Sequence, residues 1–136
     1  DLRALQGKEP LLHLLSSLQK LNAQLAKQKN TIVKPVLLKI APDLNESQLD
    51  DIIDIISQTG ISGIVATNTT ISREGLNTPK DAITEIGPGG LSGLPVQQRS
   101  TEIIKYIHYK SEGKVTLIGV GGIFDGKDAK DKLEAG

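Results

Sequence analysis

The sequence predicts an α/β fold in which about three parallel strands are covered by four helices. Two observations predict it. Short, nearly continuous apolar runs alternate along the chain with longer segments in which apolar residues recur at helical spacing. Continuous apolar runs, unlike runs that alternate with polar residues, are typical of strands in a parallel sheet that helices cover. We therefore expect one helix followed by three strand–helix units.

The first expected helix covers residues 10–28. Pro10 suits the first helical position, and leucines keep helical spacing along one face at Leu11, Leu14, Leu15, Leu18, Leu21 and Leu25. In the second expected helix, Asn45 is an N-cap and Gln48 completes the pattern of a capping box. Gly60 follows the apolar stripe of this helix, where a glycine is expected to end it.

The strands are expected at three apolar runs, namely residues 36–41, 62–67 and 115–119. A third helix is expected at about 95–109, and a fourth begins after the N-cap Asp125 and runs to about Ala135. Its charged stretch, "DGKDAKDKLE", is predicted to be a solvated helix face. Residues 72–93, between the second strand and the third helix, contain Gly and Pro and are predicted to be a long loop.

Composition excludes several classes of function. Sixteen Lys and Arg residues balance sixteen Asp and Glu residues, which removes the electrostatic case for a nucleic-acid partner. The absence of Cys excludes a thiolate nucleophile and a zinc–cysteine site. His13 and His108 lie in helical segments without companion ligands, so we predict surface or packing roles for them and no metal site. No apolar run is long enough to span a membrane.

The length bears on the architecture. The sequence has 136 residues, whereas a complete (β/α)8 barrel needs about 250, and three strands are too few to close one. The alternatives are a small open sheet and a fragment of a TIM (β/α)8 barrel. The chain starts at Asp1, contains no Met and ends at Gly136 directly after a helical pattern. We therefore expect a barrel fragment, with residues 1–136 forming part of a larger catalytic domain.

Residues suited to ligand binding follow the expected strands, at the carboxyl ends where parallel α/β folds bind their ligands. Lys39 lies near the end of the first strand, and the neutral row Thr67–Thr70 follows the second. Glycines follow the third strand at Gly121–Gly122 and precede it at Gly89–Gly93. Glycine loops expose backbone N–H groups to phosphate, a buried lysine provides positive charge, and amides and hydroxyls match ring C=O and N–H groups. Together they predict a site for a phosphorylated, planar heteroaromatic ligand.

Each of these features also has a structural interpretation. Lys39 could extend its ammonium from a strand edge to water, and Thr67–Thr70 could be a strand-end turn in which Asn68 bonds its own backbone. Both glycine loops could be simple turns or connectors. Asp43 is expected to be a turn or helix-entry residue. The functional interpretation depends on the occurrence of these features at successive strand ends, and a non-catalytic phosphate- or nucleotide-binding α/β module stays open as an alternative.

Four motifs, in this order and spacing, resemble the flavin-dependent dihydroorotate dehydrogenases: "KIAPDL" (39–44), "TNTT" (67–70), "GGLSG" (89–93) and "IGVGGI" (118–123). The opening "LRALQGK" (2–8) is also similar to that family, and the motifs resemble class 2, the quinone-linked branch. The resemblance implies an FMN-containing (β/α)8 barrel that oxidises dihydroorotate to orotate by hydride transfer to FMN and then to quinone, in de novo pyrimidine biosynthesis. A close rival is another FMN barrel acting on pyrimidine rings, such as a dihydropyrimidine dehydrogenase domain.

The resemblance also implies roles for individual residues. The residues implied to bind FMN are Lys39, Thr67, Ser92, Gly93, Gly121 and Gly122, and those implied to hold dihydroorotate or orotate are Asn68 and Thr69. Lys39 would face the pyrimidine ring of the flavin and stabilise its reduced, anionic form. The catalytic base of class 2, a serine, is expected upstream of Asp1. This chain would then be the C-terminal portion of the barrel and would contain no catalytic residue.

Four expectations follow for the behaviour of the protein. The isolated chain should be inactive and should bind FMN weakly at best. It should also self-associate, because open strand edges expose apolar surface. By resemblance, the full-length parent is expected to associate peripherally with the membrane on its cytoplasmic side.

Overall fold

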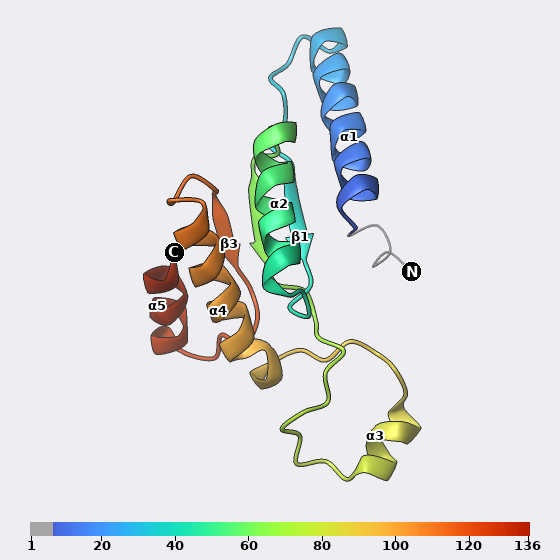
Figure 1. Ribbon diagram of the computed structural model, residues 1–136, viewed down its shortest axis with the longest axis vertical. Helices are drawn as coiled ribbons and strands as arrows, with labels where there is room; N and C mark the ends of the chain where they lie inside the picture. Colours follow the sequence, from blue (N-terminus) through green and yellow to red (C-terminus); the bar gives the residue numbers. More distant parts are fainter. Residues whose placement is uncertain (1–6) are drawn as a thin grey trace.

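The computed structural model describes residues 7–136 and has the alternating α/β order that the sequence predicts. Three strands form one parallel sheet in the order β1-β2-β3 (Figure 1). The strands are somewhat shorter than predicted. The elements are, in chain order, α1 (Lys8–Gln28), β1 (Leu37–Ile40), α2 (Glu46–Thr59), β2 (Gly63–Ala66), α3 (Lys80–Ile86), α4 (Leu94–Lys110), β3 (Leu117–Gly119) and α5 (Gly126–Ala135).

Local capping fixes the ends of two helices as predicted. The backbone N–H of Gln48 donates to the side chain of Asn45 at 2.9 Å, and the Asn45 N–H donates to Gln48 Oε1 at 2.9 Å, which completes a capping box at the start of α2. Gly60 ends this helix with a φ of 68°, in the left-handed region. Asp125 and Asp128 form the same kind of box at the start of α5.

The prediction of four helices is wrong, because the short helix α3 lies within the predicted loop 72–93. None of the residues of α3 is buried, and no side chain of the described residues caps its N-terminus. Such a helix has neither the apolar stripe nor the capping residue by which a helix is recognised in a sequence. Figure 1 shows α3 on an excursion beyond the carboxyl ends of the strands.

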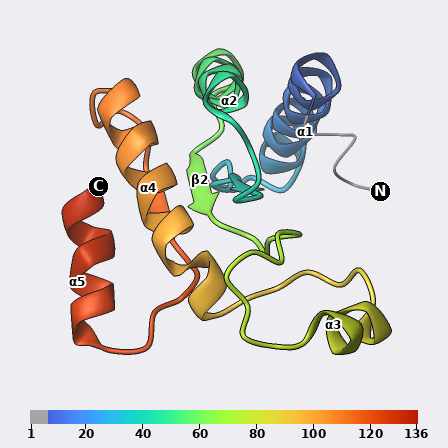
Figure 2. The same cartoon turned by 60° about the horizontal axis from the view of Figure 1, so that its bottom comes forward.

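The helices cover one face of the sheet. Leu38, Ile64 and Leu117 are register partners across the three strands, and they lie in or against the hydrophobic core. Helices α1, α2 and α4 surround β2 on this side of the sheet in Figure 2. The largest fully buried aliphatic side chains are Ile40, Leu49, Ile52, Ile55, Ile64, Val96, Ile103, Ile104 and Ile107.

The opposite face of the sheet is open. Side chains one position further along each strand lie on this face, where Lys39, Val65 and Ile118 are register partners. Lys39 and Ile118 are exposed. The prediction that Lys39 is buried is therefore wrong for this chain, because this side of β1 stays open among the described residues. In a closed barrel the same face would be the interior.

The leucines of α1 do not all reach the core. Leu11 and Leu15 are buried, but the other leucines of the predicted stripe are 37% to 50% exposed, namely Leu14, Leu18, Leu21 and Leu25. The cause is that α1 packs against α2, so the part of the stripe that faces away from α2 remains uncovered by the described residues. An apolar helix face therefore lies open at one side of the sheet.

Candidate functional site

The carboxyl ends of the strands meet at one edge of the sheet, and backbone hydrogen bonds continue the strand pairing beyond them. The N–H of Asn68 donates to the C=O of Ile40 at 2.7 Å, and the N–H of Thr67 donates to the C=O of Val120 at 2.8 Å. The peptide bond that precedes Thr67 is cis. Thr67 and Asn68 are thus held between the end of β1 and the segment that follows β3.

Thr70, the last residue of the neutral row, has a structural role. Its side chain is buried, and its hydroxyl donates to the carboxylate of Asp43 at 2.5 Å. Asp43 also accepts from the N–H of Ile71 at 3.3 Å. The backbone of Thr70 pairs with that of Leu91 through hydrogen bonds of 2.9 and 2.8 Å. Asp43, which the sequence predicts to be a turn residue, therefore anchors the segment after β2, and Thr70 joins that segment to the glycine loop before α4.

Asn68 and Thr69 have different surroundings from Thr70. Asn68 is exposed, and its side-chain amide makes no hydrogen bond within residues 7–136. An Asn in a strand-end turn would accept from the backbone two residues on, but the N–H of Thr70 donates to Leu91 instead. A Cβ at Gly90 would lie 2.1 Å from Thr69 Oγ1, so the side chain of Thr69 packs directly on the backbone of the glycine loop. Asn68 therefore does not form the strand-end turn that the structural interpretation requires.

Lys39 and Thr67 lie beside this pair. Lys39 precedes Ile40, whose C=O holds Asn68, and its ammonium has no carboxylate partner among residues 7–136. Thr67 is 2% exposed, and its hydroxyl donates to the C=O of Asn68 at 3.0 Å. The hydroxyl of Thr67 is therefore engaged inside the chain, whereas Lys39 is available to a ligand on the open face.

The first glycine loop ends at the N-terminus of α4. Ser92 is exposed, and Gly93 is the N-cap with a φ of 80°; no side chain of the described part of the chain caps this helix. A Cβ at Gly93 would meet Phe124 Cζ at 3.8 Å, an ordinary van der Waals distance, so no atom crowds Gly93. Helices α2 and α5, in contrast, start with capping boxes. An uncapped helix N-terminus fits an anion such as a phosphate group.

The second glycine loop lies against the same end of α4. Gly122 is buried with a φ of 67°, and a Cβ there would lie 2.5 Å from the Cα and 2.9 Å from the backbone N of Gln97. A Cβ at Gly121 would lie 2.9 Å from the side chain of Val96. The two glycines therefore allow the loop after β3 to approach the first turn of α4. This contact brings both predicted phosphate-binding loops to one place.

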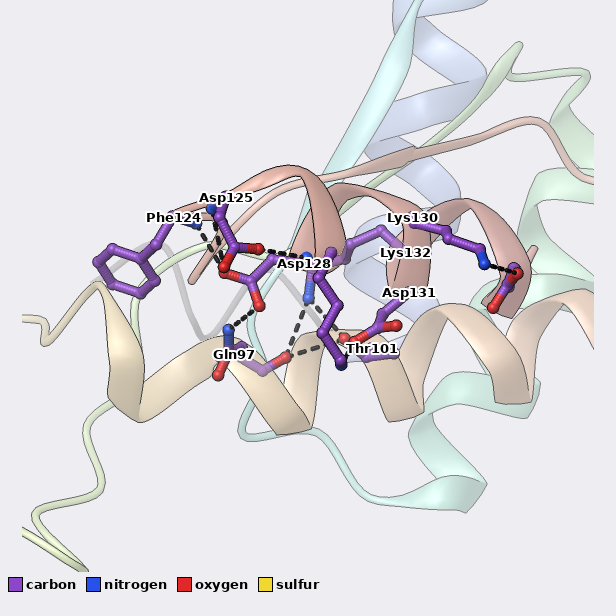
Figure 3. A network of polar contacts seen from close by, with 10 residues as sticks. Gln97, Thr101, Phe124, Asp125, Asp128, Lys130, Asp131 and Lys132 are labelled. Atoms are coloured by element: carbon purple, nitrogen blue, oxygen red, sulfur yellow. Dashed lines mark hydrogen bonds and ion pairs between the residues drawn. The ribbon is translucent and has the colours of Figure 1, made fainter.

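A polar cluster beside these loops was not predicted from the sequence. Lys132 belongs to the stretch predicted to be a solvated helix face, yet it is 6% exposed and donates hydrogen bonds to α4 (Figure 3). The prediction is wrong at this position because α5 packs on α4 and encloses the side chain. A spacing analysis counts lysine as polar, so the pattern itself contained no signal for this burial.

Other features of the sequence can be placed on the structure. His13 and His108 are exposed, as expected for surface residues. Within residues 7–136, no three His, Cys, Asp or Glu residues are arranged to hold a metal ion. No helix in that range combines the length and apolar character needed to cross a membrane. The segment "LRALQGK" falls mostly outside the described residues.

The fold and the strand-end groups define the class of protein: a parallel α/β structure whose candidate ligand site lies at the carboxyl ends of its strands. The DHODH of Eimeria tenella, solved in complex with ferulenol, is similar to it with a TM-score of 0.85 and 31% sequence identity. A ligand-free structure of the same protein matches with a TM-score of 0.85 and 32% identity. These alignments cover 99% of this chain but only 38% and 39% of those chains. The chain is therefore a section of an α/β barrel, as predicted.

The chain belongs to the dihydroorotate dehydrogenase family, whose family model matches residues 8–136. The dihydroorotate dehydrogenase (quinone) of Christiangramia forsetii is 53% identical over 136 residues, and that of Neisseria meningitidis is 43% identical over 136. The chain spans 37% and 39% of the length of these two relatives. The family implied by the four motifs is confirmed, whereas the comparisons do not support the predicted placement in the C-terminal portion.

Proposed function

We propose that the protein to which this chain belongs oxidises dihydroorotate to orotate in de novo pyrimidine biosynthesis. FMN, when bound, would accept the hydride and pass the electrons to a quinone. One observation carries the proposal: Lys39 and the side chains of Asn68 and Thr69 lie at one edge of the sheet, and Lys39 and Asn68 have no polar partner among the described residues. Relatives that carry the name dihydroorotate dehydrogenase (quinone) support this choice of reaction.

Asn68 and Thr69 would orient the substrate ring. A side-chain amide has donors and an acceptor at once, which matches the alternating N–H and C=O groups at the edge of a pyrimidine ring. The hydroxyl of Thr69 adds a group that can donate or accept. A neutral row is suitable here because a charged side chain pressed against these ring edges would have to lose its hydration. Holding the ring in one orientation contributes to the rate through positioning.

Lys39 and the glycine loops would hold the cofactor. Lys39 would place its ammonium beside the flavin ring, where a positive charge stabilises negative charge that develops in the reaction. Ser92 and Gly93 at the start of α4, together with Gly121 and Gly122, would bind the phosphate through backbone N–H groups. Thr67 would contact FMN without its hydroxyl, which is already bonded to the C=O of Asn68. The open N-terminus of α4 is the structural feature that fits this assignment.

The catalytic base is not among the residues of these motifs. By resemblance to class 2, we infer that the base is a serine that lies upstream of Asp1 in the longer protein. The same resemblance supports a quinone as the final acceptor and peripheral association with the cytoplasmic side of a membrane. These inferences rest on the order of the motifs.

Of the two alternatives, one explains less of the geometry than the proposal does, and the other uses the same groups. A non-catalytic phosphate-binding module would explain the open N-terminus of α4 and the glycine loops, but phosphate binding gives no role to the amide of Asn68. An FMN barrel that acts on another pyrimidine ring would use Lys39, Asn68 and Thr69 in the same way. Only the identity of the substrate therefore distinguishes this second alternative from the proposal.

The test uses the full-length protein, purified with its flavin and kept anaerobic. Addition of dihydroorotate should bleach the flavin absorbance, and a soluble quinone added afterwards should restore it. Dihydrouracil, which has the same ring without the carboxylate, is the matched control and should leave the absorbance unchanged. Bleaching by dihydrouracil alone would assign the protein to the other pyrimidine-ring enzymes. A protein without flavin, or one bleached by neither compound, would contradict the proposal.

A further inference from the structure

The ammonium of Lys132 is buried between α5 and α4, and all of its donors have acceptors. It donates to the C=O of Gln97 at 2.9 Å, to Ser100 Oγ at 2.5 Å and to Thr101 Oγ1 at 2.6 Å. A lysine has three N–H donors, so these three bonds satisfy it. All three acceptors lie in the first turns of α4, and Figure 3 shows the side chain of Lys132 reaching across from α5 to them.

No carboxylate forms an ion pair with Lys132 within residues 7–136; its partners are one carbonyl and two hydroxyls. Burial lowers the pKa of Lys132, and the nearby charges of Asp128 and Asp131 oppose that shift only in part. A buried cation without a paired anion is unfavourable for stability. A methionine would fill the same space without this cost, so stability alone does not explain a lysine here.

The cluster extends from Lys132 to the second glycine loop. Ser100 Oγ lies 3.3 Å from the C=O of Gly121 as well as 2.5 Å from the ammonium of Lys132. Because Lys132 donates to this oxygen, the hydroxyl hydrogen of Ser100 is directed away from Lys132, towards the carbonyls of Gly121 and Gln97. Ser100 is fully buried, so water does not compete for these bonds.

A second connection joins the same elements. Gln97 Nε2 donates to Asp128 Oδ1 at 2.7 Å, and Asp128 Oδ2 accepts from the N–H of Phe124 at 2.9 Å. Gly122 packs on the backbone of Gln97. The first turns of α4 are thus tied on one side to α5 and on the other to the Gly121–Gly122 loop.

We propose that Lys132 is a positioning residue for the flavin phosphate: through Ser100 and Gln97 it fixes the N-terminus of α4 relative to the Gly121–Gly122 loop, so that the backbone N–H groups of both loops converge on one anion. This inference rests on the proposed function, because it requires that FMN binds at these loops. Lys132 does not itself contact the phosphate. Its removal should therefore weaken recognition of the phosphate and leave recognition of the flavin ring intact.

The test compares two flavins on the full-length protein after removal of its bound cofactor. FMN and riboflavin share the ring system and differ in the phosphate. In Lys132→Met, the affinity for FMN should fall about five- to tenfold, as expected when a charged hydrogen-bond donor that orders a site is lost. The affinity for riboflavin should stay unchanged, so the ratio of the two affinities should fall. Fluorescence titration with each flavin measures both values.

Lys130→Met is the matched control. Lys130 lies on the same helix and is exposed, and its one ion pair within the described residues is a surface pair with Glu134 at 3.4 Å. Neither flavin affinity should therefore change. Equal weakening of FMN and riboflavin binding in Lys132→Met would show a general packing role and overturn the proposal. If Lys132→Met does not fold, Ser100→Ala is the second variant. It removes the link to Gly121 and should lower the ratio of FMN affinity to riboflavin affinity. An unchanged ratio in Ser100→Ala would overturn the proposal as well. Failure of the wild type to bind either flavin would instead contradict the proposed function.

Discussion

At the strand ends, neighbouring residues of similar polarity have different roles. The hydroxyl of Thr70 is buried and bonded to Asp43, whereas the amide of Asn68 is exposed and has no partner among the described residues. A polar side chain already satisfied inside the chain stabilises the fold, while one left open at a ligand site is available for recognition. The two kinds of residue should respond differently to substitution.

The variant Asn68→Ala in the full-length protein should lose affinity for orotate and keep its stability. Loss of this amide leaves polar groups of the ring unpaired in a closed site, which costs about 1–3 kcal/mol, or roughly five- to a hundred-and-fifty-fold in affinity. The melting temperature and the FMN content should stay near those of the wild type. Titration with orotate and thermal unfolding on the same preparation measure both properties.

Asp43→Ala is the contrasting variant for this test. It removes the acceptor of the buried Thr70 hydroxyl, so it should lower the melting temperature through a loss of about 1 kcal/mol. A lowered melting temperature with unchanged orotate affinity in Asn68→Ala would assign Asn68 to the fold as well, and would contradict its role in substrate binding.

The sequence predicts which residues lie at the strand ends, but it does not predict what surrounds each of them. The motifs identify Asn68 and Thr69 because their side-chain chemistry is visible in the sequence. The exposure of Lys39 and the burial of Lys132 are not visible there, because each depends on which other element lies against it. Lys39 lies in an apolar run and Lys132 in a charged one, and the packing leaves the first exposed and the second buried.

At the scale of elements, local signals predict α2 and α5 well and miss α3. The capping boxes of α2 and α5 form between residues three positions apart, so they can be read directly from the sequence. Helix α3 has no such signal. The contact between α4 and the loop after β3 is also invisible in the sequence, although the glycines that permit it, Gly121 and Gly122, are evident as a motif.

Gly122→Ala should destabilise the full-length protein and reduce its FMN content. The new Cβ would lie 2.3 Å from the Cβ of Gln97 and 2.5 Å from its Cα, so the backbone of α4 would have to move. The left-handed φ of Gly122 adds about 1–2 kcal/mol for any residue with a Cβ. Chemical unfolding measures the loss, and flavin absorbance measures the cofactor that remains bound.

Gly126→Ala is the matched control for this prediction. No atom lies within 4 Å of a Cβ at Gly126, which begins α5. An alanine there should be neutral or slightly stabilising, because glycine costs about 0.5–1 kcal/mol in a helix relative to alanine. If Gly122→Ala is as stable as this control and keeps its FMN, the close approach of the loop to α4 is not needed at this position.

At the scale of the whole molecule, two apolar surfaces remain open within residues 7–136. One is the face of the sheet that carries Val65 and Ile118, and the other is the leucine stripe of α1. In a closed barrel, further strands and helices would cover such surfaces. In the isolated chain they are free to associate, together with the unpaired edges of β1 and β3.

The isolated 136-residue chain should therefore be oligomeric and inactive. It should elute from gel filtration ahead of a monomer, retain no stoichiometric FMN and show no turnover of dihydroorotate. The open apolar surfaces favour association. FMN binding should be weak because the proposed cofactor site has only the groups at the ends of three strands. A yellow, monomeric species that keeps its flavin through the column would contradict this expectation.

The sequence predicts the architecture better than it predicts which residues are buried. Alternating apolar runs and helices indicate a parallel sheet, and the length indicates only part of a barrel. The same apolar runs led to the prediction of a buried Lys39, which is wrong because only one face of the sheet is covered among the described residues. Which face is covered depends on the whole barrel and not on any one strand.

We expect the open face of the sheet to become the flavin-facing interior of the full-length protein, with Lys39 as the one charged residue of the three strands. The rate of flavin bleaching by dihydroorotate in Lys39→Ala, measured by stopped flow, tests this most directly. Loss of a charge-assisted contact of about 1.5–3 kcal/mol should slow the reaction roughly ten- to a hundred-and-fifty-fold. Lys34→Ala, in the exposed segment that precedes β1, should leave the rate unchanged. An unchanged rate in Lys39→Ala, with normal bound FMN, would contradict the account.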